Sequence, residues 1–303
     1  MSYSLILHGG AGAGSKSFFM KIKHIDPVFE NLETLYKESL YTITSIGEQM
    51  LKDGHKAIDV VERCCIELEN NELFNAGIGA SKDIDGNITH EAVLVDGKTG
   101  NYGAICDSNT VKNPIRVARL LLPKLLVLCG NKNIKKFITS NKLGNNTDNN
   151  PIFTTPGYFK SIFRDKLSKL RKELDTVGVV ALDIFGNIAS GSSTGGLTGR
   201  PAGRLGDTHM NGVSTIADNK YCGIAVSGIG ENIIKHHVAS NVLYNIKYAK
   251  VTLASAINKG IKGCPGCGII GIDKKGVIYH NKNTERMYIG KCSSNTGIEV
   301  SIW

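Results

Sequence analysis

The sequence lacks any apolar run of about 18 residues, the length that a membrane-spanning helix needs. Its first eight residues meet Gly9 and Gly10 before the apolar core of a signal peptide can develop. The chain has 303 residues, of which 41% are hydrophobic, so it can bury a large core. We therefore expect a soluble, cytoplasmic protein with no membrane partner.

Several ligand-binding patterns are also missing. There is neither a GxGxxG nor a Walker motif, so the glycine-rich residues 8–14 favour a tight turn over a nucleotide site. Cys264 and Cys267 have zinc-like spacing, but no second CxxC pair completes a site. Without a secretion signal, the eight cysteines favour reduced thiols.

The basic excess has no nucleic-acid motif associated with it. The formal net charge is +9, and much of it comes from residues 132–142 and 160–172, which are rich in lysine. No RNA-binding or zinc-finger motif occurs there. We interpret these stretches as solvated and expect no nucleic-acid partner.

Apolar spacing predicts a mixture of helices and strands. Helices are expected over residues 31–51, 57–69 and 116–122, and strands over 3–7 and 88–96, with a hairpin within 268–279. From about Gly130 to Asp175, asparagine and lysine accumulate and the apolar periodicity fades, which predicts a flexible tether.

The tether leads to Thr176, which is followed by the buried-strand pattern Val177 to Leu182. A threonine hydroxyl is a poor nucleophile unless a base takes its proton. If the chain cuts itself between Asp175 and Thr176, the freed α-amine, with an ordinary pKa of about 7.7 to 8.0, can be that base. Any strand can begin with threonine, so this hypothesis depends on the motifs around it.

Three other segments carry polar groups suited to a reaction site. Asn75 lies between small residues, where its amide is a candidate oxyanion donor or part of an ordinary turn. Arg204 and Asp207 suit the carboxylate and ammonium of a zwitterion, or form a surface ion pair. Ser227 precedes a glycine turn at the start of a predicted helix.

Taken in order, these motifs resemble those of the plant-type L-asparaginase and isoaspartyl peptidase family of N-terminal-nucleophile hydrolases. The resemblance extends from His8 to about Ile289 and rests on residues 74–79, 175–178, 193–196, 203–207 and 228–231. It implies an α+β fold, a four-layer αββα sandwich, formed by one hydrolase domain over residues 1–303. It also implies self-cleavage into an α subunit, 1–175, whose tether spans 130–175, and a β subunit, 176–303. Two such αβ units are expected to form a homodimer.

The resemblance also implies roles for individual residues. Thr176 matches the nucleophile freed by cleavage after Asp175, and Thr194 the threonine that orients it. Asn75 and Ser227 match the groups that face the oxyanion. Arg204 and Asp207 match the pair that holds the carboxylate and amino group of the substrate, with help from two glycines, Gly228 and Gly230.

No cofactor is expected for catalysis. The family does imply a structural sodium ion, bound by the main-chain carbonyls of Leu68, Glu69, Asn71, Phe74, Ala76 and Ile78. His8-Gly9-Gly10 matches a glycine strand beside the cleavage site. The sequence departs from the family at Ser227, usually Thr, and at Glu91, usually Asp. Residues 198–201 replace the usual Asn-Lys pair and add a cation, Arg200, near the binding site.

The function implied is hydrolysis of β-aspartyl amides, either free L-asparagine or short isoaspartyl peptides. Asp175 stands where these enzymes usually have Gly, which leaves a taspase-like threonine endopeptidase as an alternative. Asp207 argues against that alternative, because an internal peptide bond offers no free amine. A lysosomal relative that removes aspartyl-linked sugars is disfavoured by the missing signal peptide. A different alternative is a scaffold that is never cut and does not catalyse.

Overall fold

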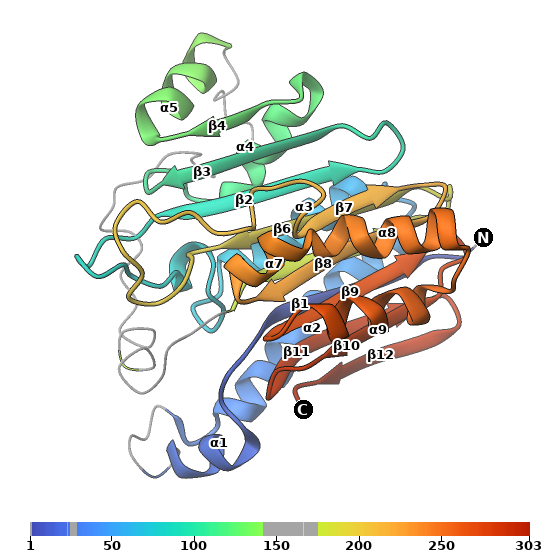
Figure 1. Ribbon diagram of the computed structural model, residues 1–303, viewed down its shortest axis with the longest axis horizontal. Helices are drawn as coiled ribbons and strands as arrows, with labels where there is room; N and C mark the ends of the chain where they lie inside the picture. The colour runs from blue at the N-terminus through green and yellow to red at the C-terminus, as the bar shows by residue number, and fades with distance from the viewer. Residues whose placement is uncertain (1, 23, 25–28, 142–165, 167–174) are drawn as a thin grey trace.

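The computed structural model describes residues 2–22, 24, 29–141, 166 and 175–303. Two β-sheets with helices packed against them make up this part of the chain (Figure 1). The expected mixture of α and β structure is therefore confirmed.

The larger sheet has eight strands in the order β12-β11-β1-β5-β6-β2-β3-β4. Neighbouring strands are antiparallel except β3 and β4, which are parallel. In chain order the strands are β1 (Ser4–Gly12), β2 (His90–Asp96), β3 (Tyr102–Ser108), β4 (Val127–Cys129), β5 (Val177–Leu182), β6 (Ile188–Thr194), β11 (Arg286–Ser293) and β12 (Thr296–Ser301).

The smaller sheet has four antiparallel strands in the order β10-β9-β8-β7. These are β7 (Thr215–Asp218), β8 (Cys222–Gly228), β9 (Cys267–Asp273) and β10 (Ile278–Lys282). Helices α7 (Gly230–His236), α8 (Val238–Ala249) and α9 (Leu253–Gly263) belong to the same part of the chain. In Figure 1 they lie in front of this sheet.

Strand β5 lies inside the larger sheet and is buried on both faces. Val177, Val179 and Ala181 pack toward the helices α2 (Leu32–Lys52), α3 (Ala57–Glu69) and α4 (Pro114–Leu121). Val180 and Leu182 instead share a cluster with side chains of both sheets. Side chains of a strand alternate between its two faces. Two buried faces explain why the segment is apolar throughout.

A third cluster joins the smaller sheet to its helices. Ile224, Val226 and Ile269 from the strands pack with Val242 of α8 and Ile257 of α9. The three clusters hold β5 and β8 close together. This proximity is seen at Gly178 of β5, where an ideal Cβ would lie 3.0 Å from the Cβ of Ala225 of β8. The residue before β5 and the end of β8 are thereby brought to one place.

The helices α2, α3 and α4 confirm the helical patterns predicted from the sequence. One prediction is wrong in part: residues 131–140 were expected to begin a flexible tether, but they form helix α5 (Asn131–Ser140). Ile134 and Ile138 of α5 are fully buried in the main core, four residues apart on one helix face. The rest of the predicted tether, up to residue 174, lies outside the described residues apart from Lys166. The remaining short helices are α1 (Lys16–Ile22), η2 (Gly77–Gly79) and η3 (Leu122–Lys124).

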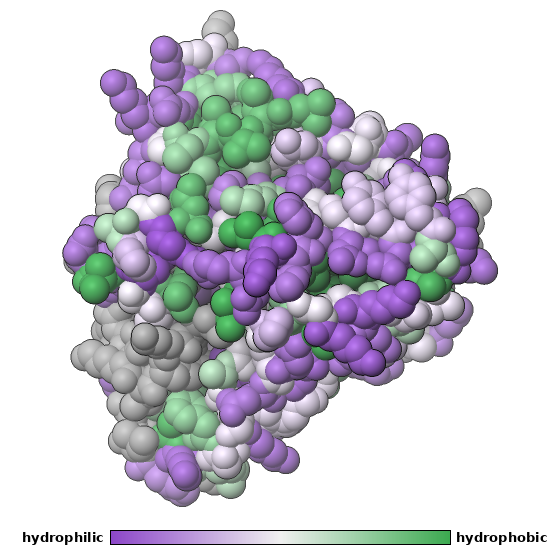
Figure 2. Space-filling view, in the orientation of Figure 1, coloured by the Kyte–Doolittle hydropathy of each residue, from purple (hydrophilic) through white to green (hydrophobic). Residues whose placement is uncertain are grey.

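The visible face of the molecule is unevenly polar. Figure 2 shows apolar side chains gathered around the edge strand β4, and Leu125 and Val127 are exposed there. Hydrophilic side chains cover much of the region of α8 and α9 in the same view. Among the described residues, no helix combines the length and apolar character required to cross a membrane.

Candidate active site

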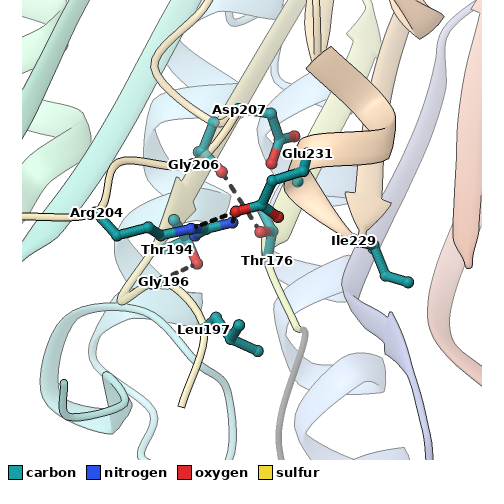
Figure 3. Close-up of a pocket in the computed structure, with 12 residues that line it drawn as sticks. Thr176, Thr194, Gly196, Leu197, Arg204, Gly206, Asp207, Ile229 and Glu231 are labelled. Carbon is teal, nitrogen blue, oxygen red and sulfur yellow. Dashed lines mark hydrogen bonds and ion pairs between the residues drawn. The ribbon is translucent and has the colours of Figure 1, made fainter. Parts of the chain in front are cut away.

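A small pocket of about 40 Å³ lies where β5, β6 and the start of α7 meet (Figure 3). That volume corresponds to a few water molecules. The pocket brings together residues from four of the five motifs, and residues 74–79, which include Asn75, are not in its lining. The lining residues are Thr176, Thr194, Gly196, Leu197, Arg204, Gly206, Asp207, Thr208, Gly228, Ile229, Gly230 and Glu231.

Thr176 directly precedes β5 and is buried in the uncut chain. Its backbone N–H donates to Ser227 Oγ at 3.1 Å, so the end of β8 reaches the predicted nucleophile. Its side-chain Oγ1 lies 3.4 Å from Thr208 Oγ1. The hydroxyl of Thr176 therefore faces the pocket while its nitrogen is held by Ser227.

Thr194, the last residue of β6, contacts the bond that is predicted to be cut. Its Oγ1 donates to the carbonyl oxygen of Asp175 at 3.4 Å and accepts from the Gly196 N–H at 3.0 Å. Val177 pairs with Ser193 in the sheet, which fixes the position of Thr194 relative to Thr176. The carbonyl and the nitrogen on either side of this bond are thus both hydrogen-bonded.

The Asn75 side chain is completely buried and braces the loop after β6. Its Nδ2 donates to the Gly196 carbonyl at 2.7 Å, and its Oδ1 accepts from the Ser81 N–H at 2.8 Å. The amide orientation is therefore fixed by backbone groups on both sides. Asn75 reaches the site through Gly196, which lines the pocket.

Arg204 and Glu231 form an ion pair at the pocket, visible in Figure 3. Arg204 Nε and Nη2 each lie 2.8 Å from Glu231 Oε1. The Glu231 side chain is 61% exposed, whereas that of Arg204 is 16% exposed. The guanidinium is therefore anchored within the pocket and its present partner lies in solvent.

Asp207 is buried, and its Oδ2 has no hydrogen-bond partner among the described residues. Burial, with a further contribution from the charge of Glu91, raises the pKa of Asp207 to about 7. A buried carboxylate with one oxygen left without a hydrogen bond favours a neighbouring cation, which restores the stability of its ionised form. A ligand ammonium group fits that requirement.

Glu91 of β2 holds the loop that carries Asp207. One carboxylate oxygen accepts from the Gly206 N–H at 2.6 Å, and the other lies 2.7 Å from His209 Nδ1. Burial opposes ionisation of Glu91, but the bonds from His209 and Gly206 outweigh it, and the pKa is lowered. This carboxylate therefore holds the backbone just before Asp207 and the imidazole ring of His209 just after it.

Gly230, at the start of α7, lies between the two charged groups. A Cβ atom at this position would be 2.8 Å from Arg204 Nη2 and 2.8 Å from Asp207 Oδ1. Gly228 has φ +150°, and a Cβ there would be 2.1 Å from the Gly266 carbonyl oxygen. Gly228 is thus restricted to glycine by its backbone, and a side chain at Gly230 would have to displace the end of Arg204 or of Asp207.

Known proteins are similar to this chain over nearly its whole length. A family model described as asparaginase matches residues 1–302. The chain belongs to the asparaginase family. It is 31% identical to an isoaspartyl peptidase of Escherichia coli, covering 94% of this chain and 91% of that protein. It is 30% identical to a probable isoaspartyl peptidase/L-asparaginase of Arabidopsis thaliana, covering 99% of both chains.

An isoaspartyl peptidase of Salmonella typhimurium is 30% identical, with 94% of this chain and 93% of that protein covered. The resemblance to asparaginases inferred from five short motifs is thereby confirmed, and it extends over nearly the whole chain.

Arg200 and His8, which the sequence places near the motifs, are both buried. Arg200, expected to add a cation near the binding site of this asparaginase-family chain, is buried. Its guanidinium donates to the carbonyls of Ser81, Thr89 and Leu197. His8 of β1 is fully buried over Gly178, and burial lowers its pKa to about 4. Arg200 braces loops, and His8 stays neutral near pH 7.

The loop expected to bind sodium follows α3 and wraps closely on itself. Cβ atoms at Gly77 and Gly79 would lie 2.2 Å from the Glu69 carbonyl oxygen and 2.1 Å from that of Phe74. Backbone carbonyl oxygens are ligands that suit hard cations, and four of the six expected ones, those of Leu68, Asn71, Phe74 and Ala76, accept backbone N–H groups of the same loop. The described residues contain no group of three His, Cys, Asp or Glu side chains placed to share a metal ion.

Two polar residues of the pocket, Glu231 and Thr208, have no role predicted from the sequence. Each directly follows a predicted substrate-binding residue, Gly230 and Asp207 respectively. This position next to a predicted substrate-binding residue was the only indication in the sequence that the two side chains line the pocket. Their orientation depends on the α7 turn and on the loop before β7.

Proposed function

We propose that this chain is a self-processing threonine hydrolase that cleaves β-aspartyl amide bonds. The observation that supports this most is one pocket lined by Thr176, Arg204 and Asp207. Arg204 offers a planar donor group for the α-carboxylate of an aspartyl substrate, and Asp207 offers a counter-charge for its α-ammonium. Thr176 is then the nucleophile nearest the side-chain carbonyl.

Self-cleavage begins when Thr176 Oγ adds to the carbonyl carbon of Asp175. The C–N bond breaks, the nitrogen gains the hydroxyl proton, and an ester remains. Water hydrolyses this ester, which leaves a carboxylate on Asp175 and frees the hydroxyl and amine of Thr176. The products are residues 1–175 and 176–303, the proposed α and β subunits.

Substrate hydrolysis uses the same hydroxyl. Thr176 Oγ adds to the β-carbonyl while its α-amine takes the proton. Ammonia or a peptide amine leaves with that proton, and water releases aspartate from the ester. Asn75 and Ser227 are the donors we assign to the oxyanion, and Thr194 orients Thr176. No step requires a cofactor.

The names of the relatives support this substrate class, since they are isoaspartyl peptidases and isoaspartyl peptidase/L-asparaginases. Purified protein incubated with L-asparagine, β-Asp-Leu and a peptide with an internal Asp tests the proposal. Aspartate release from the first two alone is expected. Cleavage of the third alone would instead support the endopeptidase, and no cleavage of any substrate would support the scaffold.

Further properties of the family are proposed on the same basis. The two contacting sheets and their helices support a four-layer αββα sandwich. The carbonyls of residues 68, 69, 71, 74, 76 and 78 suit a structural sodium ion, which would stiffen the loop before Asn75. Replacing sodium by choline should then lower the melting temperature.

We also propose a homodimer of αβ units, which size-exclusion chromatography tests. A cytoplasmic location is supported by the eight cysteines, all free thiols. Fluorescence microscopy of the tagged chain tests that location.

A further inference from the structure

The residue before the proposed cleavage point has a buried partner. Arg286 Nη1 and Nη2 donate to Asp175 Oδ1 and Oδ2 at 3.1 and 2.7 Å. Their side chains are 0% and 2% exposed, respectively. This bidentate pair belongs to neither the lining of the pocket nor the proposed substrate-binding groups.

Surrounding groups restrict the position of the pair. The Arg286 guanidinium carbon lies 4.4 Å from the centre of the Tyr288 ring, and Tyr288 stacks on Tyr36 at 4.1 Å. On the other side, Gly10 has φ +120°, and a Cβ there would be 2.3 Å from the Asp175 Cβ. Asp175 is therefore confined between β1 and Arg286.

The bond after Asp175 is consequently held at three points. Arg286 holds the Asp175 side chain, Thr194 donates to the Asp175 carbonyl oxygen, and Ser227 accepts from the Thr176 N–H. The carbonyl carbon is thereby kept beside the only hydroxyl that can open this bond by an N-to-O shift. Small displacements of a reacting group from this geometry slow a reaction by about 10²-fold.

A stabilising role alone is a weak explanation of the pair. Desolvation of two buried charges roughly cancels their attraction, and apolar replacements are often as stable. Burial opposes the charge of Arg286, yet Asp175 and neighbouring rings keep its pKa raised. The two parallel N–H···O bonds make the pair directional, which suits it to orienting the backbone.

We propose that Arg286 is a positioning residue for self-cleavage, holding the Asp175 side chain so that the following peptide bond faces Thr176. This inference rests on the proposed function. The pair with Arg286 also explains why Asp stands at position 175, where the family usually has Gly. This explanation does not require that the enzyme cleave other proteins after Asp. The proposal concerns the precursor reaction: addition of Thr176 Oγ to the Asp175 carbonyl, transfer of its proton to nitrogen, and hydrolysis of the ester.

The test measures the first-order rate at which full-length chain converts to two fragments on a denaturing gel. Arg286→Met should slow conversion by about 10²-fold. Arg286→Lys, which keeps the charge but loses the fork, should restore part of that rate. Arg119→Met removes an arginine from a partly exposed pair with Asp59 and should convert at the wild-type rate.

A double variant, Asp175→Ala with Arg286→Met, separates an effect on stability from an effect on positioning. It leaves no unpaired buried charge. Melting temperatures are measured in matching chains that also carry Thr176→Ala. Positioning predicts that the double variant regains the wild-type melting temperature but still converts slowly. Conversion that recovers with the melting temperature would overturn the proposal.

If Arg286→Met does not fold, the conversion rate of the double variant tests the proposal in its place. Wild-type conversion by Arg286→Met or by the double variant refutes the inference alone. A wild-type chain that never converts refutes the proposed function instead.

Discussion

The backbone nitrogen of Thr176 lies 3.1 Å from the hydroxyl oxygen of Ser227, which also accepts from the Ala11 N–H at 2.9 Å. One hydroxyl therefore connects β8 of the smaller sheet to two strands of the larger sheet. In the proposed self-cleavage this nitrogen becomes the amine that acts as the base. The position of Ser227 at the sheet junction thus links the fold directly to the proposed chemistry.

Ser227→Ala should lower kcat by about 10²-fold, the usual effect of losing one oxyanion donor. KM should change little, because Arg204 and Asp207 are untouched. Steady-state kinetics on β-Asp-Leu, normalised to cut chain, measure both constants. Ser227→Thr is the matched control, since it keeps the hydroxyl and should retain most activity. An unchanged kcat in Ser227→Ala would exclude the role assigned to this hydroxyl.

The pKa of Asp207, about 7, predicts that substrate binding weakens in acid. Below this pH the carboxyl is neutral and no longer attracts the substrate ammonium, so kcat/KM should fall below about pH 7. Glu91→Gln removes a charge that raises the pKa and should shift this acid limb to lower pH. A pH profile of both proteins checks the shift, and identical limbs would contradict it.

The same pKa predicts an effect on stability. The folded pKa of Asp207 exceeds that of the unfolded chain, so the folded state binds the proton more tightly. Its stability should therefore fall as pH rises from about 4 to about 7. Asp207→Asn removes this loss. The difference in melting temperature between variant and wild type should be more positive at pH 8 than at pH 4, although the variant should be inactive.

Gly230→Ala should block substrate binding and leave self-cleavage intact. Its methyl group would lie 2.8 Å from both Arg204 Nη2 and Asp207 Oδ1, in the space proposed for the substrate. Gly263→Ala is a suitable control, because a Cβ at Gly263 meets no atom within 4 Å. Gel conversion and KM are measured together. Normal KM in Gly230→Ala would mean that the substrate binds elsewhere.

Glu231→Gln should lower KM for substrates with a free α-carboxylate. Glu231 occupies two donors of Arg204, and a substrate carboxylate must compete for them. An ion pair exposed to this degree contributes about 0 to 1 kcal/mol, so the change should not exceed about fivefold. Kinetics on β-Asp-Leu at constant ionic strength measure it. A raised KM would show that Glu231 orients Arg204 and does not compete with substrate.

Much of the fold was predictable because its patterns are local. The apolar spacing of residues 32–52 and 57–69 is visible in the sequence, and these residues form α2 and α3. Helix α5 was not predicted, although Ile134, Phe137 and Ile138 have helical spacing, because the asparagine- and lysine-rich residues around these three dominate the composition of the segment. The sheet order was not accessible, because pairs such as His8 with Gly178 join distant segments.

The site was predictable to a similar extent. Thr176, Arg204 and Asp207 belong to motifs, and the structure brings them into one pocket. The surroundings of Asp175 were not predictable, since Arg286 is 111 residues away along the chain. Arg200 does lie beside Gly196 of the pocket, but the loop carbonyls that its guanidinium binds could not be predicted, because the sequence does not show which way a long side chain folds.

The central claim is that the chain cuts itself before Thr176 and that the freed residue performs the hydrolysis. Intact-mass analysis of purified protein, with β-Asp-Leu turnover measured on the same sample, tests it most directly. The account predicts two fragments that together make up the 32.6 kDa chain, the second beginning at Thr176, with turnover in proportion to the cut fraction. Uncut Thr176→Ala protein that hydrolyses β-Asp-Leu at the wild-type rate would contradict it.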